Sequence, residues 1–186
     1  MTTAWDGDEY QRRFDALAAT GVAMHGEVEL VMTFAPSTVL DAGCGTGRVA
    51  IELDRRGVDV VAADIDASML STARARAPHL PWVESDLAEL HLGRTFDVVV
   101  MAGNVPLFTA PGSQPALIAG VARHVAPGGR LISGFSLGRG YSAGQLDADA
   151  TSAGLELEQR WSTWDCRPFD ATSDYVVSVH RLRLED

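Results

Sequence analysis

Lysine is absent from this chain of 186 residues, and all 15 of its basic side chains are arginines. The absence excludes a lysine Schiff base, a lysine general base and the lysine of a phosphate-binding loop. Acidic side chains number 25, which leaves a formal net charge of −10. Because such a surface repels phosphate backbones, we expect no nucleic-acid partner.

Cysteine and long apolar runs are also scarce. Cys44 and Cys166 are too few for a disulfide framework or a zinc site, so we expect reduced thiols and no metal. No apolar run approaches the roughly 18 residues that cross a bilayer. The first ten residues carry Asp6, Asp8 and Glu9 where a signal or transit peptide needs basic residues. We therefore expect a cytoplasmic protein without a membrane partner.

Short apolar runs alternate with amphipathic stretches along the chain, which is typical of an α/β fold with a mainly parallel sheet. Strands are expected over 38–40, 58–63, 81–83, 96–101 and 130–135. Helices are expected within 8–33 and over 48–55, 66–78, 114–125 and 142–153. Two further β-like runs, 155–165 and 174–184, predict a terminal hairpin whose last strand is antiparallel to the others.

These elements predict a doubly wound sheet of about seven strands with helices on both faces. At this length, one domain is expected. It divides into an N-terminal helical cap (1–36), a ligand-binding core (37–136) and a C-terminal helix and β-hairpin (137–186).

A glycine loop is the strongest local signal. It reads Asp41-Ala-Gly-Cys-Gly-Thr-Gly-Arg48, between a predicted strand and a predicted helix. Glycines at such a turn let a ligand lie against the backbone at the positive end of the helix. The nicotinamide-dinucleotide fingerprint needs its third glycine where Arg48 stands, so an oxidoreductase fits less well and remains an alternative.

Two more acidic residues follow at the ends of the next two predicted strands. Asp64 ends the second predicted strand and Asp86 the third, as Asp41 does the first. Ligands of open α/β sheets bind at the carboxyl ends of strands near the switch point, so we expect the three acids to face one crevice. Taken singly, each acid is also explained as a helix cap or a turn residue.

This loop, these acid spacings and the turn Pro127-Gly128-Gly129 resemble the class I S-adenosylmethionine-dependent methyltransferases over 39–184. The resemblance implies a Rossmann-like fold. It also implies S-adenosyl-L-methionine as cofactor, S-adenosyl-L-homocysteine as product and methyl transfer by in-line displacement. The acidic charge and the missing lysines favour a small-molecule acceptor. A catalytically silent cofactor-binding module of the same fold is a further alternative, and the oligomeric state stays open.

Site roles also follow from the resemblance. The loop from Gly43 to Gly47 passes beneath the methionine part and the ribose, and Asp41 helps to hold the ammonium group. Asp64 accepts both ribose hydroxyls. The full predicted cofactor set is Asp41, Gly43, Cys44, Gly45, Gly47, Asp64, Ile65, Met69, Asp86, Leu87, Ala102, Gly103 and Asn104.

The adenine and methyl ends complete this set. Ile65 and Met69 lie against the adenine face, Asp86 accepts from its amino group, and Leu87 supplies a backbone N–H. The segment 102–104 borders the reacting methyl group. It continues through Val105-Pro106-Leu107-Phe108, which departs from the Asn-Pro-Pro-aromatic loop of amino-methylating members, so base or glutamine methylation is not expected.

No catalytic residue is identified, since a base is needed only if the acceptor must lose a proton. The candidates near the crevice are His25, Asn104, Tyr141 and Asp165. Cys44 is interpreted as the small side chain that the loop requires rather than as a nucleophile. Trp5, Tyr10 and Phe14 form either a lid over the cofactor or helix packing. Trp161, Trp164 and Phe169 line either a pocket or a dimer contact.

Overall fold

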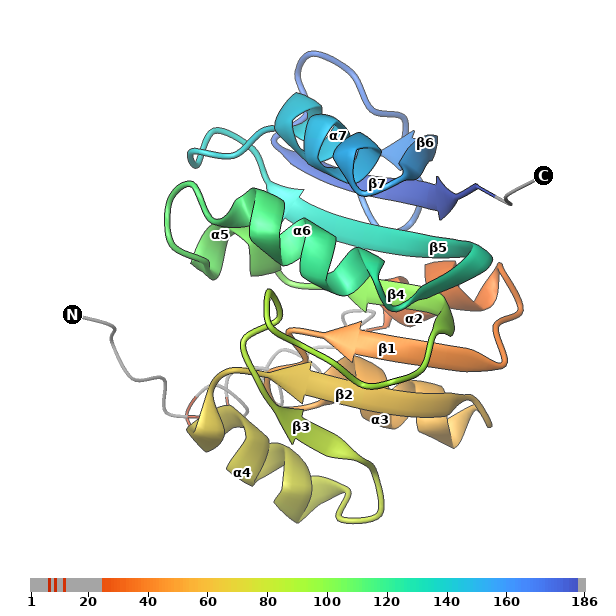
Figure 1. The fold of residues 1–186 in the computed structure, drawn as a ribbon, viewed down its shortest axis with the longest axis vertical. Helices are drawn as coiled ribbons and strands as arrows, with labels where there is room; N and C mark the ends of the chain where they lie inside the picture. Colours follow the sequence, from red (N-terminus) through yellow and green to blue (C-terminus); the bar gives the residue numbers. More distant parts are fainter. Residues whose placement is uncertain (1–6, 8, 10–11, 13–24, 184–186) are drawn as a thin grey trace.

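A seven-stranded sheet with the order β3-β2-β1-β4-β5-β7-β6 organises the protein (Figure 1). The structure is a computed structural model that describes residues 7, 9, 12 and 25–183. The strands are β1 (Thr38–Ala42), β2 (Asp59–Asp64), β3 (Trp82–Glu84), β4 (Phe96–Met101), β5 (Val125–Ser136), β6 (Leu155–Trp161) and β7 (Tyr175–Leu182). The predicted Rossmann-like doubly wound sheet is confirmed.

The strand order reverses beside β1. This strand pairs in parallel with β2 on one side and with β4 on the other, so the chain moves outward to β3 and then returns. The loops after β1 and β4 therefore lead in opposite directions, and open α/β sheets bind their ligands at such a point. In Figure 1 the arrowheads of β1, β2 and β5 point to the same edge.

Helices cover both faces. The helices are α2 (Gly26–Met32), α3 (Arg48–Arg55), α4 (Ala67–Arg76), α5 (Val105–Phe108), α6 (Gln114–Ala122) and α7 (Ala143–Ser152). One apolar cluster joins α2, α3 and α4 to the sheet through Val31, Leu53 and Leu70. The other joins α6 and α7 to the opposite face through Ile118 and Leu146. Figure 1 shows α6 and α7 on the near side and α2 and α3 behind.

Side-chain hydrogen bonds to backbone N–H groups fix where two of the helices begin. Asp66 caps α4, because its side chain accepts from the N–H groups of Ser68 and Met69. Ser142 and Gln145 form a reciprocal capping box at the start of α7. None of the helices in the described ranges combines the length and the apolar character that a membrane crossing requires.

The terminal hairpin is confirmed, with β7 antiparallel to both β5 and β6. Some boundaries differ from the prediction. Helix α6 ends at Ala122 and β5 begins at Val125, so the predicted turn at Pro127–Gly129 lies inside β5, beside an irregular register with β4. Val125 pairs with Phe96 of the neighbouring strand, and such a pairing cannot be predicted from the turn propensity of nearby residues. Helix α5 was not predicted, and β6 ends at Trp161 rather than at residue 165.

Most of the predicted N-terminal cap lies outside the described residues, including Trp5, Tyr10 and Phe14. Within it the structure describes α2, whose Val28 and Val31 are fully buried against the sheet. The division at residues 36/37 and 136/137 remains a prediction.

Candidate active site

The glycine loop adopts a conformation that side chains rarely tolerate. Gly43, Gly45 and Gly47 have φ angles of 80°, 54° and 82°. The N–H groups of Gly43 and Cys44 donate to the carbonyl oxygen of Ala63 at 2.8 and 3.1 Å. The loop is thus fastened to the carboxyl end of β2, and its glycines supply the left-handed turns.

The three glycines face different surroundings. A Cβ atom at Gly43 would lie 2.5 Å from a methyl group of Val105, and one at Gly47 would lie 2.3 Å from the ring of Trp82. At Gly45 a Cβ atom would meet no atom of the described residues within 4 Å. Gly43 and Gly47 are therefore required by packing within the protein, whereas Gly45 presents bare backbone to open space.

Asp64 lies directly against this open glycine. Its Oδ2 atom accepts the N–H of Gly45 at 2.7 Å, and its Oδ1 atom accepts the N–H of Asp66 at 2.9 Å. Burial raises the pKa of the Asp64 carboxyl, against the effect of these backbone donors. Each carboxylate oxygen keeps acceptor capacity beyond its one backbone donor.

Asp41 lies beneath the loop and is 1% exposed. Its Oδ2 atom accepts the N–H of Ala50 in the first turn of α3 at 3.0 Å. Burial raises the pKa of Asp41 to about 7, while the nearby Arg48 acts in the opposite direction. The carboxyl group therefore supports the start of α3, and its contact with an ammonium group remains a prediction.

The predicted adenine end is open and partly apolar. Ile65 follows Asp64 with 65% of its surface exposed, whereas Met69 and Leu87 are buried. Asp86 is exposed after β3, and its Oδ1 atom accepts the N–H of Ala88 at 2.9 Å. An exposed isoleucine and an exposed carboxylate thus follow the ends of neighbouring strands.

The segment after β4 is tied to β5. The N–H of Ser136 donates to Asn104 Oδ1 at 2.7 Å, and the N–H of Asn104 donates to the carbonyl oxygen of Gly134 at 3.2 Å. Gly103 is exposed with a φ of 77°, and a Cβ atom there would meet nothing within 4 Å in the part of the chain that the structure describes. Ala102 beside it is half-buried. Gly103 is therefore a second place where bare backbone faces open space.

The candidate catalytic side chains come from different segments of the chain. His25 precedes α2, and its Nδ1 atom is buried without a hydrogen-bond partner in the described part of the chain. Tyr141 lies on the α7 side, where its hydroxyl donates to Asp149 at 2.5 Å. Burial raises the pKa of this tyrosine well above its usual value. Asp165 is exposed and pairs with Arg167 at 3.2 Å. Tyr141 and Asp165 thus each have a partner already, and the segments of His25 and Asp165 adjoin, because a Cβ atom at Gly26 would lie 3.1 Å from the Cβ atom of Trp164.

Cys44 is buried, and burial raises the pKa of its thiol well above the usual value. The thiol therefore stays protonated at neutral pH, which does not favour a nucleophile. Its interpretation as the small side chain that the loop requires remains a prediction. Among the described residues, no group of three or more potential metal-ligating side chains gathers in one place.

An ion pair beside the loop was not predicted from the sequence. Arg48 makes two hydrogen bonds to Glu27, at 3.0 and 2.5 Å, and both side chains are largely buried. Trp164 and Tyr175 pack over Gly134 nearby and share a hydrogen bond of 3.2 Å. In the sequence, Arg48 was considered only because it does not fit the dinucleotide fingerprint. No pattern among neighbouring residues indicated its pairing with Glu27.

Comparison with known proteins decides the family. A model described as "Methyltransferase domain" matches residues 39–129. A TehB-like S-adenosylmethionine-dependent methyltransferase from Corynebacterium glutamicum, of known crystal structure, is 36% identical. The match covers 95% of this chain and 97% of that chain, with a TM-score of 0.88. This chain belongs to the S-adenosylmethionine-dependent methyltransferases.

This methyltransferase is also similar to parts of longer proteins. The magnesium-protoporphyrin O-methyltransferase of Rhodobacter capsulatus is 41% identical over 78 residues, which are 39% of this chain and 34% of that protein. The dTDP-3-amino-3,4,6-trideoxy-alpha-D-glucopyranose N,N-dimethyltransferase of Streptomyces venezuelae is 31% identical over 97 residues, which are 52% and 41% respectively. The matches thus span less than half the length of these two curated relatives.

Membership confirms the family predicted from the glycine loop and the acid spacing, and S-adenosylmethionine is the cofactor of that family. It also decides against the nicotinamide-dependent alternative.

Proposed function

We propose that this methyltransferase transfers the methyl group of S-adenosylmethionine to a small-molecule acceptor. The observation that carries the proposal is the open backbone of Gly45 held against the carboxylate of Asp64. A glycine that nothing in the described structure fills, next to a carboxylate with spare acceptor capacity, suits a nucleoside with two ribose hydroxyls. When bound, the cofactor supplies an electrophilic methyl group.

The nucleoside would be held at the carboxyl ends of β2 and β3. Asp64 would accept the ribose hydroxyls while its backbone donors keep the carboxylate in place. Ile65 and Met69 would cover the adenine, and this contact would shield the exposed surface of Ile65 from water. Asp86 would accept from the adenine amino group, and the N–H of Leu87 would donate to the ring.

The methionine part would lie over the loop from Gly43 to Gly47, including Cys44, with the exposed backbone of Gly103 on the other side. Asp41 is buried beneath the loop, so its contact with the ammonium group would run through water. Ala102 and Asn104 would border the methyl group. The Oδ1 atom of Asn104 already accepts from Ser136, which leaves its amide NH₂ to contact a ligand.

Rate enhancement in such a site comes largely from alignment of the acceptor behind the methyl group and from exclusion of water. His25 is a candidate base if the acceptor must lose a proton. A small acceptor is supported by the net charge of −10 and by two relatives, which are named for a porphyrin and for an amino sugar. The same charge supports the absence of a nucleic-acid partner.

Two further proposals concern the cellular compartment and the domain organisation. Both cysteines are free thiols, which supports a reducing compartment such as the cytoplasm. The terminal hairpin completes the same sheet that carries the glycine loop, which supports a single methyltransferase domain.

Calorimetric titration with S-adenosylhomocysteine tests the proposal. Asp64→Asn should weaken binding at least about tenfold, which corresponds to about 1.4 kcal/mol, because an amide cannot accept both ribose hydroxyls in the same way. The matched control is Asp59→Asn, which changes an exposed residue at the other end of β2 and should leave affinity unchanged.

Failure of the wild-type protein to bind S-adenosylhomocysteine contradicts the proposal outright. Equal effects of the two substitutions contradict the role of Asp64. Binding together with no methyl transfer to a broad panel of small acceptors favours the catalytically silent alternative.

A further inference from the structure

Two aromatic side chains of the terminal hairpin lie beside the segment that follows β4. Trp164 belongs to the segment that joins β6 to β7, and Tyr175 is the first residue of β7. A Cβ atom built on Gly134 would lie 2.3 Å from the ring of Trp164 and 2.9 Å from the hydroxyl oxygen of Tyr175. The carbonyl oxygen of Gly134 accepts the N–H of Asn104 at 3.2 Å. Both rings are therefore close to the residues that are proposed to border the methyl group.

The side chain of Asn104 reaches the same place. Its Oδ1 atom accepts the N–H of Ser136 at 2.7 Å, and Ser136 is the register partner of Tyr175 across β5 and β7. Partners in an antiparallel pair have Cα atoms about 4.5–5.5 Å apart. Asn104 and Tyr175 thus meet at the carboxyl end of β5, which is the edge of the sheet to which β1 also points (Figure 1).

Helix α2 approaches Trp164 from another direction. A Cβ atom at Gly26 would lie 3.1 Å from the Cβ atom of Trp164. The next residue, Glu27, accepts one hydrogen bond from Arg48 on each carboxylate oxygen, and Arg48 directly follows the glycine loop. Trp164 therefore adjoins both Gly134 and the helix that pairs with the end of the loop. The ion pair also compensates the negative charge of Glu27.

The polar groups left over in this region are hydrogen-bond donors. The hydroxyl oxygen of Tyr175 accepts from Trp164 Nε1 at 3.2 Å, and no group in the described ranges accepts the hydroxyl proton. Asn104 uses its Oδ1 atom for Ser136, and its NH₂ group likewise has no acceptor among the described residues. A ligand that binds here must therefore supply acceptor atoms.

We propose that Tyr175 and Asn104 bind the methyl acceptor by donating hydrogen bonds to it, and that the acceptor carries an anionic oxygen on a flat apolar body. This inference rests on the proposed function. Hydrogen bonds to a charged acceptor are the stronger ones, so an anionic oxygen gains most from two such donors. The half-buried ring of Trp164 supplies the apolar contact. A protonated amine gains nothing from these donors.

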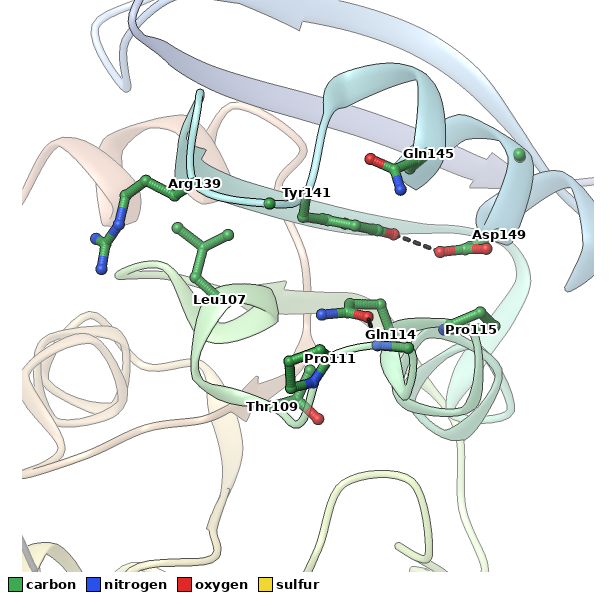
Figure 2. A pocket seen from close by; sticks show the side chains of 12 residues that line it. Leu107, Thr109, Pro111, Gln114, Pro115, Arg139, Tyr141, Gln145 and Asp149 are labelled. Atoms are coloured by element: carbon green, nitrogen blue, oxygen red, sulfur yellow. Dashed lines mark hydrogen bonds between the residues drawn. The ribbon is translucent and has the colours of Figure 1, made fainter. Parts of the chain in front are cut away.

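A second tyrosine provides the matched comparison. Tyr141 lines a cavity of about 320 Å³ between α6 and α7, where Figure 2 shows its hydroxyl bonded to Asp149. Of the described residues that line this cavity, none belongs to the glycine loop or to segment 102–104. The Tyr141 hydroxyl already has its acceptor, so its removal is not expected to affect binding of the methyl acceptor.

Two probes of opposite charge test the class directly. Benzoate carries an anionic oxygen on a flat apolar body, and benzylamine is a cationic compound of similar size. Saturation-transfer NMR is recorded with the protein already loaded with S-adenosylhomocysteine. We expect benzoate to bind with a Kd on the order of 1 mM, as suits a ligand of this size, and benzylamine to bind at least about tenfold more weakly. The net charge of −10 by itself favours the opposite order.

Variants connect this preference to the two donors. Tyr175→Phe should weaken benzoate binding at least about tenfold and leave the affinity for S-adenosylhomocysteine unchanged. Tyr141→Phe removes the same atom and should leave both affinities unchanged. Asn104→Asp keeps the acceptor for the Ser136 N–H but replaces the NH₂ group by a carboxylate oxygen. It should weaken benzoate at least about tenfold and strengthen benzylamine.

The outcomes separate this inference from the proposed function. If S-adenosylhomocysteine itself does not bind, the proposed function fails before the acceptor is tested. If it binds but benzoate does not bind up to concentrations on the order of 10 mM, the inference is overturned. Benzylamine binding as tightly as benzoate, or equal effects of the two tyrosine substitutions, overturns it as well. So does an equal loss of benzoate and S-adenosylhomocysteine affinity in Tyr175→Phe, because that result indicates a purely structural role.

Discussion

Gly45→Ala separates a ligand contact from a packing requirement, because Gly45 has a positive φ of 54° and open space around it. Gly57→Ala is its matched control. Gly57 lies in the turn between α3 and β2 and has a φ of 85°, and among residues 25–183 it also has no atom within 4 Å of a built Cβ atom. Both substitutions introduce the same methyl group into a left-handed backbone position without a clash.

The cost to stability is therefore expected to be alike. An L side chain in this conformation costs about 1–2 kcal/mol. For a chain of this size, each kcal/mol lowers the Tm by about 2–4 °C. Only the methyl group of Gly45→Ala would stand where the cofactor approaches the backbone. We expect its affinity for S-adenosylhomocysteine to fall at least about tenfold, or about 1.4 kcal/mol, while Gly57→Ala binds like wild type.

Urea unfolding measures the loss of stability, and calorimetric titration with S-adenosylhomocysteine measures the loss of affinity. Wild-type affinity in Gly45→Ala would refute the reasoning that this glycine lies against the cofactor. An equal loss of affinity in Gly57→Ala would show that backbone strain, rather than the position of the methyl group, controls binding.

Two further predictions concern stability. Native Asp41 keeps its proton up to about pH 7 whereas the unfolded chain releases it near 3.8, so the unfolding free energy should fall as the pH rises through this range. Asp41→Asn should lose less stability than wild type between pH 5 and 8 in urea unfolding, and parallel profiles would contradict the raised pKa. Ser142→Ala removes the acceptor for the Gln145 N–H and should cost about 1 kcal/mol of unfolding free energy. An unchanged urea midpoint would show that the capping box contributes nothing to stability.

Much of the sheet was predictable because its signals are local. The strand 96–101 is almost wholly apolar, and the structure has β4 over the same residues. Helix α5 escaped prediction because its four residues are too few to show a helical period and include Pro106. The N-terminal part of β5 was not predicted because Pro127 and two glycines are typical of a turn. Pairing with β4 keeps this segment in the sheet.

The site was predictable in part. The glycine loop and Asp64 were singled out from their spacing, and the structure places Asp64 within 2.7 Å of the Gly45 nitrogen. Tyr141 was predicted as a candidate near the crevice, and the structure shows its hydroxyl donating to Asp149 of α7. Glu27 was not considered, because its partner Arg48 comes from a different helix.

The sequence by itself determined the alternation of strands and helices, the loop that only glycines can form, and the family. The first two depend on apolar periodicity and on the φ range of single residues, which are properties of short segments. The family follows from the resemblance of the loop and of the acid spacings. The tertiary structure alone decided which glycine is open. Val105 and Trp82 fill the space beside Gly43 and Gly47 and leave Gly45 bare, and they reach the loop from α5 and β3. Contacts between segments far apart in the chain exist only once the sheet has brought those segments together.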